Sequence, residues 1–113
     1  MDGVLALLAA SSVVQYRVVS IDANKKVAYP TSGAIALGVT LGAASAEDSV
    51  DVQYLAIAEI EVGTAGVSLN SYVKAETDGR IVTATAGDKI VGAPLESGVV
   101  GDIIPVLLIN ATA

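Results

Sequence analysis

The stretch Gly33-Ala34-Ile35-Ala36-Leu37-Gly38-Val39-Thr40-Leu41 returns later in the chain as Gly87-Asp88-Lys89-Ile90-Val91-Gly92-Ala93-Pro94-Leu95. The two copies are offset by 54 residues (87 minus 33), and the match extends in both directions without a gap. Residues that keep their chemical character at this offset are Val19 with Val73, Asp22 with Glu76, Lys26 with Arg80, Val27 with Ile81, Asp48 with Asp102 and Val52 with Val106. A repeat of this length indicates that one supersecondary unit is used twice.

Outward from this stretch, each copy consists of short β-branched runs separated by turn residues. The clearest turn signal is Asp78-Gly79, which is typical of a β-hairpin. Pro105 cannot donate to a ladder, so it predicts an edge strand or a bulge in the last run. The predicted strands cover residues 16–21, 27–29, 35–41, 51–62, 67–75, 80–84, 89–95 and 103–109.

Short strands at regular spacing with glycine turns are typical of a small barrel or sandwich. We therefore predict a mainly β fold, a small β-barrel or β-sandwich built from two quasi-repeats, in this chain of 113 residues. The β domain is expected over residues 15–113, with quasi-repeat units at about 16–62 and 67–110.

Residues 1–14 are expected to form a short N-terminal arm or helix, because Leu5, Leu8 and Ala9 have helical spacing. The segment packs either on its own domain or on a neighbouring subunit, and we expect the β domain to fold without it. No basic residue precedes the apolar run 4–10 and Asp2 is acidic, so we do not interpret the run as a signal peptide. The candidate contact with a neighbouring subunit or another partner is formed by Val4, Leu5, Leu7 and Leu8.

The composition limits both the core and the partners. The apolar share is 53%, but Phe and Trp are absent, so a core of Ala and Val is expected to gain stability from oligomerisation. The net charge of −6 and the scattered basic residues argue against nucleic acid as a partner. No apolar run approaches the length that a membrane span requires, so no membrane partner is expected.

Catalytic groups are scarce. The chain has no His and no Cys, which removes the usual general base, the thiolate nucleophile and the common soft metal ligands. Its turn aspartates are expected to bond to their own backbone rather than to act in chemistry. They are Asp22, Asp48, Asp78, Asp88 and Asp102. We predict no catalytic, cofactor-binding or metal site, no cofactor and no enzymatic activity.

The second copy carries a longer pattern: Asp78-Gly79-Arg80-Ile81-Val82, then Thr85-Ala86-Gly87-Asp88-Lys89-Ile90-Val91-Gly92-Ala93-Pro94-Leu95-Glu96, then Gly101-Asp102-Ile103-Ile104-Pro105-Val106-Leu107-Leu108. From Gln15 onward the chain resembles the capsid cement, or head decoration, proteins of tailed bacteriophages. The resemblance implies a non-enzymatic protein that binds the outside of an expanded capsid and stabilises it. It also implies the major capsid protein and a homotrimer as partners. The candidate contact formed by Val4, Leu5, Leu7 and Leu8 is then a capsid or intersubunit contact. The expected location is the outer surface of the virion, after synthesis in the host cytoplasm.

A carbohydrate- or ligand-binding β module of a phage fibre or surface protein is the alternative. Sugar rings stack on aromatic side chains, and the chain has no Trp for this purpose. Its aromatic residues are Tyr16, Tyr29, Tyr54 and Tyr72. Binding to a glycan array would favour this alternative.

Overall fold

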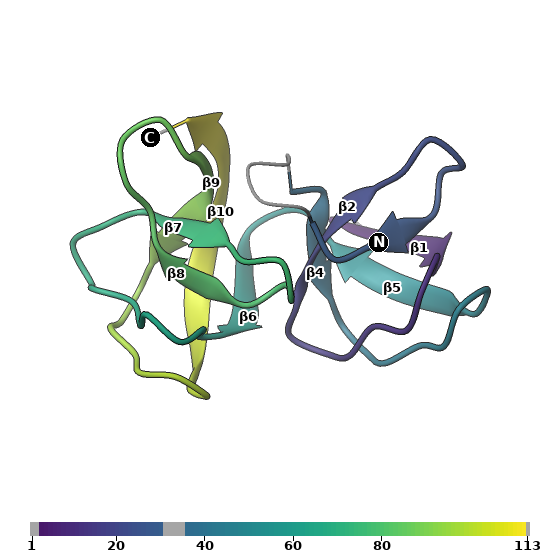
Figure 1. Ribbon diagram of the computed structural model, residues 1–113, viewed down its shortest axis with the longest axis horizontal. Helices are drawn as coiled ribbons and strands as arrows, with labels where there is room; N and C mark the ends of the chain where they lie inside the picture. Colours follow the sequence, from purple (N-terminus) through teal and green to yellow (C-terminus); the bar gives the residue numbers. More distant parts are fainter. Residues whose placement is uncertain (1–2, 31–35, 113) are drawn as a thin grey trace.

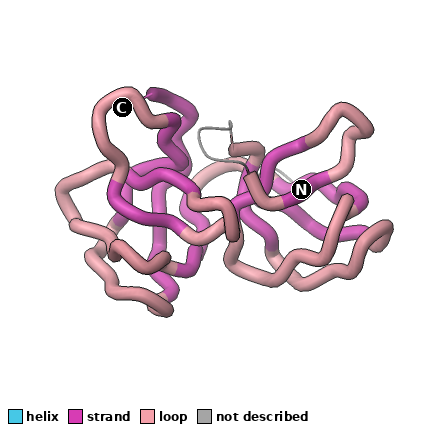
Figure 2. The backbone as a smooth tube through the Cα atoms, viewed as in Figure 1, coloured by secondary structure: helices cyan, strands magenta, loops and turns pink. Residues whose placement is uncertain are grey.

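The computed structural model describes residues 3–30 and 36–112, and this part of the chain folds into strands, turns and loops without a helix (Figures 1 and 2). The mainly β class predicted from the sequence is confirmed. The strands are β1 (Val4–Leu8), β2 (Val18–Ile21), β3 (Val27–Ala28), β4 (Gly38–Thr40), β5 (Ser49–Gln53), β6 (Ile57–Glu61), β7 (Val73–Ala75), β8 (Ile81–Thr83), β9 (Lys89–Pro94) and β10 (Ile103–Thr112).

The strands form two five-stranded antiparallel sheets with the same order. The first sheet runs β1-β5-β4-β2-β3 and the second runs β6-β10-β9-β7-β8, so each strand of one sheet has its counterpart five strands later. We call β1–β5 the first unit and β6–β10 the second unit; they lie side by side in Figure 1, with the first unit on the right. The repeat in the sequence is therefore a repeat of sheet topology.

Each sheet closes into a small barrel. A parallel bridge between Ala9 and Val27 joins the end of β1 to β3, and its counterpart between Val62 and Ile81 joins β6 to β8. The hairpin turns also repeat. Asp22 N–H donates to Lys26 O at 2.8 Å, and Glu76 N–H donates to Arg80 O at 2.7 Å. Closure removes most of the free strand edges that a five-stranded sheet would otherwise expose.

The repeated glycine of the opening stretch has a packing reason. Gly38 in β4 and Gly92 in β9 hold the same place in the two units, directly against the neighbouring strand. A Cβ at either position would overlap the backbone carbonyl of Gln53 or of Leu107. A side chain there would push β4 off β5, or β9 off β10, and open the barrel.

The helical turn expected near the N-terminus is wrong, because residues 4–8 form β1 and pair with β5 from Val4↔Gln53 to Leu8↔Ser49. An isolated turn of helix is unstable, whereas the edge of β5 offers unpaired backbone groups. Ala9 and Val13 are 0% and 2% exposed in the core. Removing residues 1–14 would take away a strand and two core side chains, so these residues are part of the first sheet and its core; folding of the β domain without them stays a prediction.

The predicted strand 51–62 is two strands that belong to different sheets. β5 ends at Gln53 and β6 begins at Ile57, with Ala56 between them at φ 68°. A positive φ is unusual for an alanine and marks the turn between the units. Of the predicted strand 35–41, β4 covers Gly38–Thr40, and Ile35 lies outside the described residues.

The edge position expected for Pro105 is wrong, since β10 lies between β6 and β9. Leu95 N–H donates to Pro105 O at 2.9 Å. In an antiparallel ladder the nitrogen and the carbonyl of one residue face the same neighbour, so the proline nitrogen faces the end of β9. Pairing with β9 starts only at Val106↔Pro94. The N–H that Pro105 lacks would have pointed beyond the paired part of β9, so its absence costs little folding free energy.

The hydrophobic core has two parts, and two residues of the first unit belong to the core of the second. Val19 and Val27 are packed inside the first unit, whereas Val18 and Val39 join the cluster around Ile60. The accessible surface of 5754 Å² equals the roughly 5,700 Å² expected for a folded monomer of this mass. The core of small side chains therefore closes without a partner.

Main-chain hydrogen bonds hold the two units together at the internal junction, by which we mean the contact of residues 16–18 and 39 with residues 58–61 and 78–80. Val18 N–H donates to Gly79 O at 2.7 Å, and Glu61 N–H donates to Tyr16 O at 3.0 Å. Gly79 has φ +81°, and a Cβ there would lie 2.7 Å from Val18 O and 2.8 Å from the Tyr29 ring. Its counterpart in the first unit is Lys25, which is exposed.

We predict that Gly79→Ala lowers the free energy of unfolding by at least about 2 kcal/mol, because it adds strain at positive φ and a clash at the junction. Gly101→Ala is the matched control: Gly101 has φ +90° and nothing within 4 Å of its Cβ position. That variant should lose only about 1 kcal/mol. Urea denaturation of both variants makes the measurement, and equal losses would contradict the role given to the junction.

Candidate interaction surface

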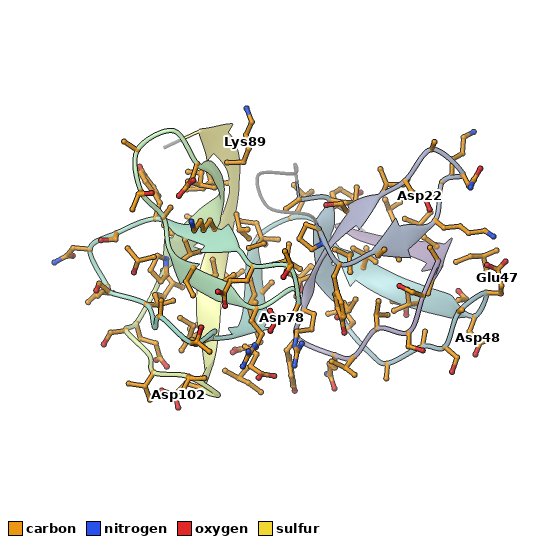
Figure 3. The ribbon with its side chains drawn as sticks, in the orientation of Figure 1. Asp22, Glu47, Asp48, Asp78, Lys89 and Asp102 are labelled. Carbon is orange, nitrogen blue, oxygen red and sulfur yellow. The ribbon has the colours of Figure 1, made fainter. Side chains whose placement is uncertain are left out.

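The carboxylates of the described residues are spread over the molecule. No cluster of three or more acidic side chains suited to a metal ion exists among the described residues. Figure 3 shows the labelled aspartates spread over both units. Four turn aspartates accept backbone N–H groups, as expected: Asp22 from Asn24 and Lys26, Asp78 from Arg80, Asp88 from Thr85, and Asp102 from Val99. The part of the chain that the structure describes also holds no helix long and apolar enough to cross a membrane.

An apolar groove of about 760 Å³ lies between the two units. Strands β1, β2 and β4 supply one wall, β9 and β10 supply the other, and the linker between β5 and β6 joins them. The lining residues are Leu5, Ser20, Ile21, Ala36, Leu37, Gly38, Tyr54, Leu55, Ile90, Val91, Leu108 and Ile109. Pockets of this size and lining are suited to an apolar ligand or to a side chain of a partner.

The linker at the groove is fixed by hydrogen bonds. Gln53 donates its amide N–H to Leu55 O at 2.8 Å and to Ile57 O at 2.9 Å. Leu108 N–H donates to Ala56 O at 2.9 Å, which ties the linker to β10. Leu55 is nevertheless 53% exposed. A firmly held backbone therefore presents an apolar side chain to solvent, which is typical of a contact surface.

The four residues predicted as a capsid or intersubunit contact lie on two faces of β1. Leu5 and Leu7 are opposite Val52 and Val50, which are core residues, so they lie on the inner face. Leu5 lines the groove and Leu7 packs against the core. Val4 and Leu8 lie on the outer face, where Leu8 is 44% exposed. These residues do not form the single apolar face that helical spacing would have given.

A second apolar surface was missed in the sequence, on the outer face of β10. Leu107 and Ile103 point outward there, and both are exposed. Their counterparts in the first unit are Gln53 and Ser49. The register of β10 on β6 matches that of β5 on β1, so the comparison is position for position. A comparison of the two repeats at exposed positions could have indicated this surface from the sequence.

An ion network spans the internal junction beside these surfaces. The Arg17 guanidinium donates to Asp78 O at 2.9 Å and to a Glu61 carboxylate oxygen at 3.2 Å. Arg80 pairs with Asp78 at 2.7 Å and with the other Glu61 oxygen at 3.7 Å. Arg17 also lies 5.9 Å from the centre of the Tyr29 ring. Arginines from both units therefore share the Glu61 carboxylate, and Arg17 also reaches the main-chain carbonyl of Asp78, so the network ties the two walls of the groove together.

No protein-family model and no curated protein matches the chain. Among solved structures, the chain is similar to the N base of the head fiber gp8.5 of bacteriophage phi29, with a TM-score of 0.79. The two folds are alike from end to end. The match covers 97% of this chain and 96% of that chain, at 16% sequence identity. At this identity the likeness is one of fold alone, and the coverage means that it includes both units.

We predict that Asp78 contributes to stability in an acid-dependent way. Burial raises the pKa of Asp78, but hydrogen bonds from Arg80 and the charges of Arg80 and Arg17 outweigh it and hold the pKa below the ordinary 3.8. Because the pKa of Asp78 is lower in the folded protein than in the unfolded chain, its carboxylate stabilises the fold fully at pH values above 3.8. This contribution to the free energy of unfolding is lost as the pH falls through the pKa of the folded protein. The loss of unfolding free energy in Asp78→Asn should be largest above pH 3.8 and should shrink below it. Urea titrations from neutral pH to about pH 2 test this, and a constant difference would contradict it.

Proposed function

We propose that the chain is a non-enzymatic structural protein of a bacteriophage head, which binds the outer surface of the expanded capsid and stabilises it. The observation that carries this proposal is the likeness of fold, along nearly the whole of both chains, to a protein described as the base of a phage head fiber. A chain with the same two barrels is suited to the same kind of place.

The surface of the chain supports a binding role. Exposed large apolar side chains lie in the groove and on β10, although the core is complete without a partner. Contiguous apolar surface of this kind marks interaction sites on soluble proteins. The net charge of −6 suits the outside of a capsid, where contact with packaged DNA is not required.

We assign the contact with the major capsid protein to the groove, and in particular to Leu5 and Leu55. Both side chains line it, and they come from β1 and from the fixed linker. An apolar side chain of the capsid protein inserted between the two units would bury both leucines. Capsid expansion would then control binding if it creates the surface that presents this side chain.

The carbohydrate-binding alternative has less support in the same groove. Tyr54 is the tyrosine among its lining residues, and the rest of the lining is aliphatic apart from Ser20. Sugars need several fixed hydrogen-bonding groups as well as an aromatic platform. Carbohydrate binding is therefore one possible outcome of the capsid-binding experiment.

The test is co-sedimentation of the protein with expanded heads that lack decoration, titrated to saturation. We expect saturable binding at a fixed ratio to the major capsid protein. Leu55→Ser should weaken binding at least about tenfold, as loss of a central apolar anchor does. Val99→Ser is the control, because Val99 is an exposed apolar residue in the loop 96–101 and does not line the groove.

Thermal unfolding of both variants checks that the fold is kept, since each change replaces an exposed side chain. Equal binding by Leu55→Ser and the wild type would remove the groove from the proposal. No binding of the wild-type protein to intact expanded heads, together with retention on a glycan array, would move the assignment to the carbohydrate-binding module.

A further inference from the structure

The internal junction uses one face of each unit, and the repeat places a copy of each face at the two ends of the molecule. Residues 16–18 of the first unit correspond to residues 70–72 of the second, which are not covered by a third unit. Gly79 of the second unit corresponds to Lys25 of the first at the offset of 54. By the register of β6 on β10 and of β1 on β5, Glu61 corresponds to Leu8, so the β1 and β6 strands match at an offset of 53 (61 minus 8). We call residues 70–72 with Thr83 the free face of the second unit, and Leu8 with Lys25 the free face of the first.

The backbone of both free faces is ready to pair. Ala9 N–H donates to Asp48 O at 2.9 Å, on the β5 side. Successive N–H groups of a strand point to opposite sides, so Leu8 N–H points to the open edge of β1. This group is the counterpart of Glu61 N–H, which pairs with Tyr16 O inside the chain. The counterpart of Tyr16 is Asn70, and Asn70 is exposed.

The side chains of the two free faces differ from the junction in a matched way. Arg17 and Glu61 form an ion pair in the junction. Their counterparts are Ser71 and Leu8, so both charges are absent together. Val18 is replaced by Tyr72, which is 50% exposed, and Glu61 is replaced by Leu8, which is 44% exposed, so each free face presents an exposed apolar side chain. Exposed aromatic residues of this kind are typical anchors of protein interfaces.

The steric changes are matched as well. A side chain at Gly79 is excluded by Val18 O, the Tyr29 ring and the Arg17 Cβ, all within 3.0 Å of its Cβ position. At the free faces the glycine becomes Lys25, while Tyr29 and Arg17 become the smaller Thr83 and Ser71. The free face of the second unit therefore has the smaller side chains, and the free face of the first unit has the larger one, Lys25. The second contact therefore differs from the junction in its side-chain packing around residue 25.

We propose that a second copy of this chain docks head to tail, with the free face of its second unit on the free face of the first unit of its neighbour. The two faces lie toward opposite ends of the 36 Å long axis (Figure 1). Such a heterologous contact closes into a ring when the tilt between successive copies divides a full turn, and otherwise it extends a filament. This inference deepens the proposed function by naming the surfaces through which the predicted trimer forms, and its test uses the protein without a capsid.

Single cysteine variants of this cysteine-free chain provide the test. Asn70→Cys and Leu8→Cys replace the counterparts of two residues that share a main-chain hydrogen bond in the junction. We expect an intermolecular disulfide when the two variants are mixed and oxidised, and much less when either is oxidised alone. Ser97→Cys, at an exposed position outside both faces, mixed with Leu8→Cys, is the control.

Sedimentation equilibrium gives an independent readout. Leu8→Glu restores the charge that Glu61 has in the junction, but without its arginine partner, and should raise the dissociation constant at least about tenfold. Val99→Glu is the control for an added charge at an exposed apolar position. Cross-linking of Leu8→Cys with itself would show a two-fold contact and overturn the proposal. Equal linking in the mixture and in the Ser97 control would also overturn it. Either result leaves capsid binding to be judged by co-sedimentation.

Discussion

The close approach of the second hairpin to the backbone of Val18 is the constraint on which the rest of the structure depends. The approach requires a residue without a Cβ at position 79, and it places the carbonyl of Gly79 on Val18 N–H. Once this contact is made, Val18 and Val39 complete the core of the second unit, and the ion network around Glu61 closes over them. The angle between the barrels follows from it, and so does the groove between them.

Much of this architecture could be predicted from the sequence, because it is local. The turns at residues 22–26 and 76–80 and the repeated glycines at 38 and 92 fix the hairpins and strands of each unit, and they recur at one offset. The strand β1 was misread because Leu5 and Leu8 fit a helical period, whereas pairing with β5 is a long-range choice that no local pattern encodes. The division of residues 51–62 between two sheets depends on the positive φ of Ala56. An alanine in the sequence does not predict a positive φ.

The groove and the junction could not be predicted from the sequence for a related reason. They are formed where two units meet, and their residues are scattered from Leu5 to Ile109. A comparison of the repeats partly replaces the missing information. Positions that are buried in both units keep their character, as Val27 and Ile81 do, while exposed positions such as Ser49 and Ile103 diverge. Divergence toward apolar side chains at the surface is not needed for folding, and it indicates contact with other molecules.

A duplicated barrel of this kind combines a self-sufficient core with several apolar surfaces. We propose the groove for attachment to a shell and the two end faces for contact between copies, while the core belongs to the fold of each chain. Each role uses a different set of residues, so each can be removed separately by substitution. This separation suits a protein proposed to attach at a fixed geometry on a lattice and to stabilise it from outside.

The most direct test of capsid attachment is a cryo-electron microscopy reconstruction of expanded, decoration-free heads saturated with the purified protein. We predict added density on the outer surface at symmetry-related positions, into which the two-barrel chain fits with the groove toward the shell. Heads whose reconstruction is identical with and without the protein would contradict the proposed function. Density on the inner surface would contradict it equally.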